Sequence, residues 1–259
     1  MHFDIKEVCY NAEKLKEKLM QWTPETFLLA NFILITSSIL QMATGVSVGM
    51  IIVPFLAMIS YTLVPVPVIF ASLTLTIMMA YKGREHIDLR NVKEIAIGML
   101  AGIFVAVFVL ANTHVEYLGV LFGVLILISV GISIKVKTFR LTPTKNYIGG
   151  LFAGTMGAMA AVGGQILALL FQNHPLESIK ATLAFLYTLF SIAMLAIFYY
   201  FGEFSYDQMI SGFYMMPGFL IGFFISPFFV KYFKAKYSKV VVLGMATLGS
   251  VLLIYKSLL

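Results

Sequence analysis

Long apolar runs, separated by short polar or basic connections, dominate this chain. No charged residue lies between Glu25 and Lys82, and a second uncharged run extends from Asn146 to Leu176. A globular surface in water needs charge, whereas a bilayer core about 30 Å thick needs roughly 20 apolar residues for each helical crossing. The pattern therefore predicts a polytopic membrane protein.

The apolar runs favour helices over a β-barrel. In lipid, only helices and closed barrels satisfy their backbone polar groups, and barrel strands alternate in polarity over short segments. The runs of this chain do not alternate, so the expected fold class is all-α. We expect ten apolar segments, at residues 27–44, 46–60, 63–81, 92–111, 116–134, 146–162, 164–172, 177–201, 208–230 and 239–257.

The order of segment lengths is similar in the two halves of the chain. Each half begins with a helix that ends at a Gly- or Ser-containing break, continues with a short segment and ends with three longer helices. Such internal symmetry is typical of duplicated transporters. We therefore expect a first transmembrane repeat at 27–134 and a second at 146–257, within a single transmembrane domain.

Charges in the connections orient the two repeats. The connections at 82–93, 135–145 and 231–239 each contain four Lys or Arg residues, so the positive-inside rule assigns them to the cytoplasm. The connection at 202–207 contains two acidic residues and no basic one, which places it outside. Corresponding connections of the two halves then face opposite sides of the membrane, and this predicts an inverted repeat.

The orientation also constrains the short segments. An even number of crossings must fit between residues 146 and 176, and the apolar piece at 164–172 is too short to span the bilayer at 1.5 Å per residue. The prediction is a broken or re-entrant helix near the midplane in each half.

Residues 1–26 have a different pattern. Apolar side chains recur there at spacings of three and four, which predicts an amphipathic helix lying at the membrane interface. Its apolar face would be formed by Ile5, Val8, Ala12, Leu15, Leu19 and Trp22. We expect a surface anchor, with a lateral gate or a homodimer contact as the alternatives.

The two predicted breaks are the candidate sites for chemistry. A helix that restarts after a glycine inside the membrane directs its free N–H groups and positive dipole end into the gap. Two such ends near the midplane would bind a small anion without a buried arginine. Close helix packing through small residues is the alternative. The candidate substrate-binding residues are Thr44, Gly45, Ser47 and Gly49 at the first break, Gly163, Gly164 and Gln165 at the second, and Lys180 and Thr182 at the start of the next helix.

Isolated ionisable groups add two hypotheses. Lys180 lies at the start of a long apolar helix, where it would neutralise an anionic substrate or extend to the interface and pair with Glu177. His114 and His174 lie at the edges of connections and can titrate near neutral pH. Coupling of transport to protons is therefore an open alternative, as is coupling to another ion.

Composition and motifs exclude several classes. The chain is 60% hydrophobic and 12% charged, with a net charge of +6, and its basic residues indicate membrane orientation rather than nucleic-acid binding. The single cysteine, Cys9, excludes a disulfide framework and a Cys-cluster metal site. The metalloprotease, lipase and phosphate-loop motifs are missing. We therefore expect no enzyme activity, no cofactor and no metal.

The order of small-residue motifs resembles the TauE/SafE sulfite-exporter-like family of bacterial and archaeal membrane proteins, over residues 27–257. In the second half the motifs are Gly150-x3-Gly154-x2-Gly157, Val162-Gly163-Gly164, Lys180-Ala181-Thr182-Leu183, Phe201-Gly202-Glu203-Phe204 and Met216-Pro217-Gly218-x3-Gly222. In the first half they are Gly45-x3-Gly49 with Pro54, Gly83-x4-Asp88 and Gly98-x3-Gly102. Gln165 stands where the family often has proline or glycine.

The resemblance implies a multi-pass protein of the cytoplasmic membrane that transports sulfite, organosulfonates or related small sulfur-containing anions. It also implies seven or eight spans in two repeats, so the shorter of the ten segments are expected to be half-helices. Alternating access would follow from rocking of the two halves about the breaks. An anion channel or uncoupled facilitator, or a membrane subunit of a larger complex, is the alternative.

Overall fold

The computed structural model describes residues 22–47, 49–135, 142–230 and 235–258, and this part of the chain is helical without any β-strand. The helices are α2 (Pro24–Thr44), α3 (Gly49–Ile59), α4 (Val66–Lys82), α5 (Val92–Ala111), α6 (Val115–Lys135), α7 (Pro143–Ala160), α8 (Gly164–Phe171), α9 (Leu176–Tyr200), α10 (Tyr206–Val230) and α11 (Ala235–Leu258), with short 3₁₀ turns η1 (Tyr61–Leu63) and η2 (Arg84–His86). They coincide with the ten expected segments. The expected amphipathic helix at 1–26 lies almost entirely outside the described residues.

Two helices begin a few residues before the apolar runs that predicted them, because threonine caps extend them. Thr23 Oγ1 accepts a hydrogen bond from Thr26 N at 3.2 Å, and Pro24 occupies the first helical position of α2. Thr142 caps α7 in the same way, and again a proline follows. A Thr-Pro pair supplies the side-chain acceptor and the fixed φ that a helix start favours.

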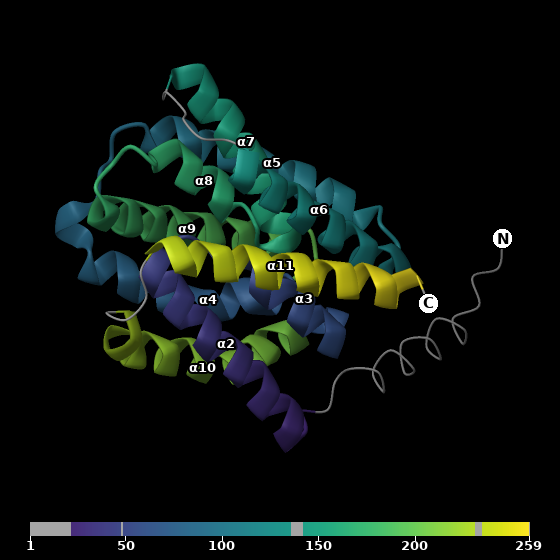
Figure 1. Ribbon diagram of the computed structural model, residues 1–259. Coiled ribbons are helices and arrows are strands. Elements are labelled where there is room, and N and C mark those ends of the chain that lie inside the picture. Colours follow the sequence, from purple (N-terminus) through teal and green to yellow (C-terminus); the bar gives the residue numbers. More distant parts are fainter. Residues whose placement is uncertain (1–21, 48, 136–141, 231–234, 259) are drawn as a thin grey trace.

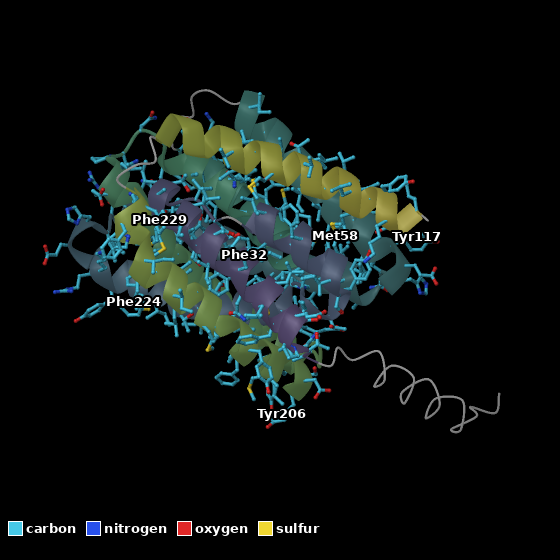
Figure 2. The ribbon with its side chains drawn as sticks, turned by 60° about the horizontal axis from the view of Figure 1, so that its bottom comes forward. Phe32, Met58, Tyr117, Tyr206, Phe224 and Phe229 are labelled. Carbon is cyan, nitrogen blue, oxygen red and sulfur yellow. The ribbon has the colours of Figure 1, made fainter. Side chains whose placement is uncertain are left out.

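The outer surface of the helices is apolar. Six of the described helices are long and apolar enough to cross a membrane. Figure 2 shows Phe32 and Phe224 projecting from the surface, and each is 64% exposed. Aromatic side chains in such numbers on the outside are unfavourable in water and favourable against lipid tails. The chain is therefore a multi-pass membrane protein.

Each major helix contact joins the two halves of the chain. Helix α5 packs on α7, α2 on α10, α4 on α9 and α6 on α11. In Figure 1, α4 and α9 cross the middle, with α5 and α7 on one side and α2 and α10 on the other. Exchanging α2–α6 for α7–α11 converts the α5–α7 contact into the α10–α2 contact and leaves the α4–α9 and α6–α11 contacts unchanged. This is the pattern expected of two halves related by a two-fold axis, and the inverted orientation of the repeats stays a prediction.

Glycines permit the two outer contacts. On the α5–α7 side, Cβ atoms added at Gly98, Gly102, Gly150 and Gly154 would each overlap a backbone carbonyl of the partner helix. Close backbone approach through small residues is a common way for helices to associate in lipid, where no hydrophobic force drives them together.

The α10–α2 contact uses equivalent positions. Gly98 faces the carbonyl of Tyr147, and Gly218 faces that of Asn31. Residues 31 and 147 are 116 positions apart in the chain. The next glycine along each helix repeats this relation, since Gly102 faces the carbonyl of residue 151 and Gly222 that of residue 35. The same spacing supports duplication of one ancestral packing unit.

Asn31 joins α2 to α10 by hydrogen bonds as well. Its Oδ1 accepts from Gly218 N at 2.6 Å, and its Nδ2 donates to Tyr214 O at 3.0 Å and to Phe27 O at 2.9 Å. In a regular helix the N–H of residue 218 would bond to the carbonyl of residue 214. The Asn31 amide therefore takes the place of this helical hydrogen bond, because its oxygen accepts from the N–H of residue 218 and its nitrogen donates to the carbonyl of residue 214. Pro217, the neighbouring residue of α10, has no N–H to donate.

Replacement of Gly154 by alanine tests the role of the glycine contacts. The added methyl group would overlap the backbone of Met99, so Gly154→Ala is expected to lower stability by about 1–3 kcal/mol. The measurement is thermal unfolding of the purified protein in detergent. Gly131→Ala is the matched control, because nothing lies within 4 Å of a Cβ at that helical position, and alanine there should be neutral or stabilising by about 0.5–1 kcal/mol. Equal effects of the two substitutions would contradict the packing argument.

Candidate functional site

Both predicted breaks are present, and both helices end in the left-handed conformation. After α2, Gly45 has φ +75° and its N–H donates to Gln41 O at 2.7 Å. After α7, Ala161 has φ +54° and its N–H donates to Gly157 O at 2.9 Å. A left-handed C-cap satisfies the last carbonyls of a helix, and it is uncommon for a residue with a Cβ atom. Residues 45 and 161 are again 116 positions apart.

The two breaks contact each other through Ser47. Its Oγ donates to Ala161 O at 3.5 Å, and its carbonyl accepts from Gln165 Nε2 at 3.3 Å. Tyr187 on α9 links the two breaks, since its hydroxyl accepts from Ser47 N at 3.2 Å and donates to Gly164 O at 3.5 Å. We call this pair of hydrogen bonds the crosspiece. The N–H and carbonyl of Ser47 and the carbonyl of Ala161 are thus satisfied by the opposite half of the chain, as a low-dielectric environment requires.

Glycine is needed at the crossing because the backbones nearly touch. A Cβ atom on Gly164 would lie 2.6 Å from both Ser47 Cβ and Tyr187 Oη. One on Gly49 would overlap the carbonyl of Ala161. The glycines at the breaks therefore allow the crossing sterically, independently of any contact with a ligand.

A cavity of about 60 Å³, which we call the central cavity, lies at this crossing. A buried water needs ~15 Å³ on the same measure, so the space fits a solute of a few heavy atoms. Gly49 and Gly164, the first residues of α3 and α8, both line it. The polar side chains in its lining are Gln41, Ser47, Ser72, Thr76, Tyr187 and Ser191, and its apolar lining includes Ile52, Met99, Leu167, Phe190 and Phe219.

Gln41 and Ser191 are the polar side chains in the described lining of the cavity that make no hydrogen bond to the protein. Of the two, Gln41 carries an amide, which can both donate and accept. It is 4% exposed, and within the described part of the chain its side-chain amide makes no hydrogen bond. Among the described residues, the fully buried polar side-chain atoms without a partner are Ser37 Oγ, Asn146 Oδ1 and Gln172 Nε2. The amide of Gln41 is not one of them, because it faces the space of the cavity. A donor and an acceptor are therefore available to a solute beside two helix starts.

The structure separates the expected site residues into groups. Ser47, Gly49, Gly163 and Gly164 line the central cavity. Thr44 and Gln165 line a second cavity, of about 210 Å³, which also borders α6 and α11.

Gly45 and Lys180 contact each other away from the central cavity. A Cβ on Gly45 would lie 2.6 Å from Lys180 Cγ, so the lysine stem covers the end of α2. Lys180 lines a third cavity, of about 270 Å³, together with Glu177, whose carboxylate is 4.0 Å from Lys180 Nζ.

Thr182 is not brought to any of these cavities. It is fully buried, and its hydroxyl accepts from Asp88 N at 2.9 Å. Asp88 in turn lies 3.0 Å from Arg90 Nε and 3.5 Å from His174 Nε2. Hydrogen bonds from Arg90 hold the pKa of the Asp88 carboxyl below its usual value. This cluster holds the α4–α5 connection against the start of α9. It also engages His174, one of the two histidines considered for proton coupling.

Five polar lining residues were not predicted as site residues from the sequence: Gln41, four positions before Gly45 of the first break, and the hydroxyl residues Ser72, Thr76, Tyr187 and Ser191. The last four lie inside ordinary apolar helices, where single hydroxyl residues carry no distinctive pattern. One signal existed: Ser72 on α4 and Ser191 on α9 are 119 positions apart, and so are the glycines that follow the two helices, Gly83 and Gly202. Aligning the two halves would have paired the serines.

These features define a helical membrane protein whose two interrupted helices cross at a small polar cavity. The chain belongs to the family described as Sulfite exporter TauE/SafE, whose model matches residues 29–253. This confirms the resemblance seen in the motifs. Because the family consists of exporters, it also agrees with the expectation that the chain is not an enzyme and with a location in the cell membrane.

A curated relative has a corresponding name. Over 152 residues the chain is 29% identical to the "Probable sulfite/organosulfonate exporter TauE" of Cupriavidus necator, and the match covers 54% of this chain and 58% of that protein. The matched part is thus a little over half of the relative's length. No solved structure matches the chain.

Tyr187→Phe tests the crosspiece between the breaks. Loss of the hydroxyl leaves the partly buried N–H of Ser47 without its acceptor, so stability is expected to fall by about 1 kcal/mol. Thermal unfolding in detergent is the measurement, and Tyr199→Phe is the control because Tyr199 is 74% exposed on the same helix. If the two variants unfold at the same temperature, the crosspiece does not stabilise the crossing.

Proposed function

We propose that the protein transports small sulfur-containing oxyanions, such as sulfite or organosulfonates, across the cytoplasmic membrane and binds them in the central cavity. Family membership and the name of the Cupriavidus relative support the substrate class. The observation that carries the proposal is the meeting of two helix starts with the unpartnered amide of Gln41 around one small space.

The cavity suits an oxyanion because hydrogen-bond donors surround it. Helices α3 and α8 begin there, and the first N–H groups of a helix have no partners within the helix. Gly49 N at the start of α3 donates to Ser47 Oγ at 3.4 Å, whereas the start of α8 has no side-chain cap. The amide of Gln41 and the hydroxyl of Ser191 add further donors, while the hydroxyls of Ser72 and Thr76 donate to carbonyls of α4. An oxyanion presents several acceptor oxygens at once and would accept from donors on more than one helix.

The electrostatic balance favours a single negative charge. The described residues that line the central cavity are all uncharged. Each helix start contributes the equivalent of about half a positive charge, so two starts balance roughly one negative charge. A dianion would be left with an uncompensated charge in a low-dielectric site, which is costly. We therefore expect hydrogen sulfite and sulfonates to be transported in preference to dianions.

Transport would follow alternating access. The cavity is lined by α4 from the first half and α9 from the second, and these helices pack on each other. Rocking of one half against the other would change the α4–α9 contact and with it the side from which the cavity is reached. The crossing of the breaks lies at this contact and would act as the pivot.

Gln41→Leu tests the proposed binding site. Leucine fills a similar volume without the amide, so transport of labelled sulfite into proteoliposomes is expected to fall at least about tenfold, a loss of ~1.4 kcal/mol or more. Because the native amide faces the cavity and has no hydrogen-bond partner among the described residues, the melting temperature should be unchanged or raised. Thr247→Val on α11 is the control, since that exposed hydroxyl only bonds to its own helix. Normal transport by Gln41→Leu would reject the site.

Substrate charge provides a separate test. Methanesulfonate carries one negative charge and sulfate carries two, and their oxyanion heads are similar in size. Wild-type proteoliposomes are expected to take up methanesulfonate and to exclude sulfate, and sulfite uptake should fall as rising pH converts hydrogen sulfite into the dianion. Sulfate uptake at the methanesulfonate rate would contradict the charge-balance argument.

A further inference from the structure

The third cavity, of about 270 Å³, is lined by charged side chains, whereas the described lining of the central cavity is uncharged. It is lined by Lys82 at the end of α4 and by Lys180 and Glu177 at the start of α9, together with apolar residues of α2 and α10. We call it the vestibule. By the positive-inside rule it opens on the cytoplasmic side, because Lys82 begins one of the basic connections.

The vestibule and the central cavity are stacked along the same four helices. On α9, Lys180 lines the vestibule and Tyr187 lines the central cavity; on α10, Ser226 and Phe219 have the same relation. Seven residues separate the members of each pair, which corresponds to about 10 Å along a helix. Met42 and Met79 line the vestibule, next to residues of α2 and α4 that line the central cavity.

The lysines of the vestibule are weakly neutralised. Glu177 is 69% exposed and its carboxylate lies at 4.0 Å from Lys180 Nζ, the limit of an ion pair. Lys82 Nζ lies 5.8 Å from the ring centre of Phe223, and within the described residues it has no carboxylate partner. Glu177 is the one acidic residue among the described residues that line the vestibule, and His86 also lines it. Two cations therefore face one cavity with a single, loosely held counter-charge.

Lys180 also connects the vestibule to the first break. Its side chain is 18% exposed, and its stem packs across Gly45, where α2 ends. An anion that draws the ammonium group away from Glu177 would act on a side chain in contact with the break. The position of Lys180 is thus better suited to receiving an anion than to holding it within the central cavity.

We propose that the vestibule is a second anion-binding site, in which Lys82 and Lys180 capture a small oxyanion from the cytoplasm before it enters the central cavity. The inference rests on the proposed function for the identity of the transported anion. Attraction between exposed charges is screened by salt, whereas binding by dipoles and neutral donors in an enclosed cavity is screened much less. The two sites should therefore differ in salt dependence.

The test is a titration of the full-length protein in detergent with methanesulfonate, by calorimetry, at low and high ionic strength. The wild type is expected to bind two anions, one of them only at low salt. Lys82→Gln and Lys180→Gln should each weaken the salt-sensitive site about tenfold or more and leave the other unchanged. Lys82→Arg and Lys180→Arg should keep both sites, because the charge is retained.

Two controls separate the vestibule from general charge and from the central cavity. Lys93→Gln removes a charge from the same cytoplasmic connection but not from the vestibule lining, and it should leave both sites intact. Gln41→Leu should remove only the salt-insensitive site.

If the Lys→Gln variants keep both sites, or if Lys93→Gln weakens binding equally, the vestibule proposal is overturned, and the proposed function still stands on transport by the wild type. If the wild type binds one anion that depends on the two lysines and not on Gln41, and transports none, the vestibule stands and the proposed function fails.

Discussion

The hydrogen bonds that join Ser47 to Ala161, Gln165 and Tyr187 are the interaction on which the rest of the structure depends. Two helices that stop within a membrane protein expose carbonyl and N–H groups that lipid cannot satisfy. Here each break supplies partners to the other, and glycines allow the backbones to come close enough for it. The same constraint explains why the halves interlock: neither break is satisfied without the opposite half of the chain.

Polar groups in the interior divide into two kinds. Asn31 satisfies its amide fully by bridging α2 to α10, and Thr182 accepts from a loop N–H; both serve the fold. Gln41 lies on the same helix as Asn31 and has no such partner in the described part of the chain. Because the amide of Gln41 faces the central cavity and not a protein partner, the contrast between these two side chains on α2 points to a role for Gln41 in binding rather than in packing.

Positive charge decreases stepwise along the transport path that we propose, from the basic connections through the vestibule to the central cavity. The connections that the positive-inside rule assigns to the cytoplasm are basic. The vestibule has two lysines opposing one exposed carboxylate, and the described lining of the central cavity is neutral. An anion that moves along this path from the cytoplasm to the central cavity would first replace its contacts with water by contacts with lysine side chains, and then by hydrogen bonds to fixed dipoles. Tight binding by a buried cation would hinder release, so neutral donors at the centre suit a transporter better than an immobile lysine would.

The sequence by itself determined the helices, their breaks and the membrane location, because apolar run length, glycine position and loop charge are local properties with a direct physical meaning. It also indicated the family. Only the tertiary structure decided which residues share a cavity. Tyr187 and Gln41 both line the central cavity, although about half the chain separates them. Two residues that were predicted to bind substrate lie elsewhere: Lys180 lines the vestibule, and Thr182 accepts a hydrogen bond from the α4–α5 connection. Which face of a uniformly apolar helix turns inward depends on its neighbours, and here the main packing partners of α2, α4, α5 and α6 come from the other half of the chain.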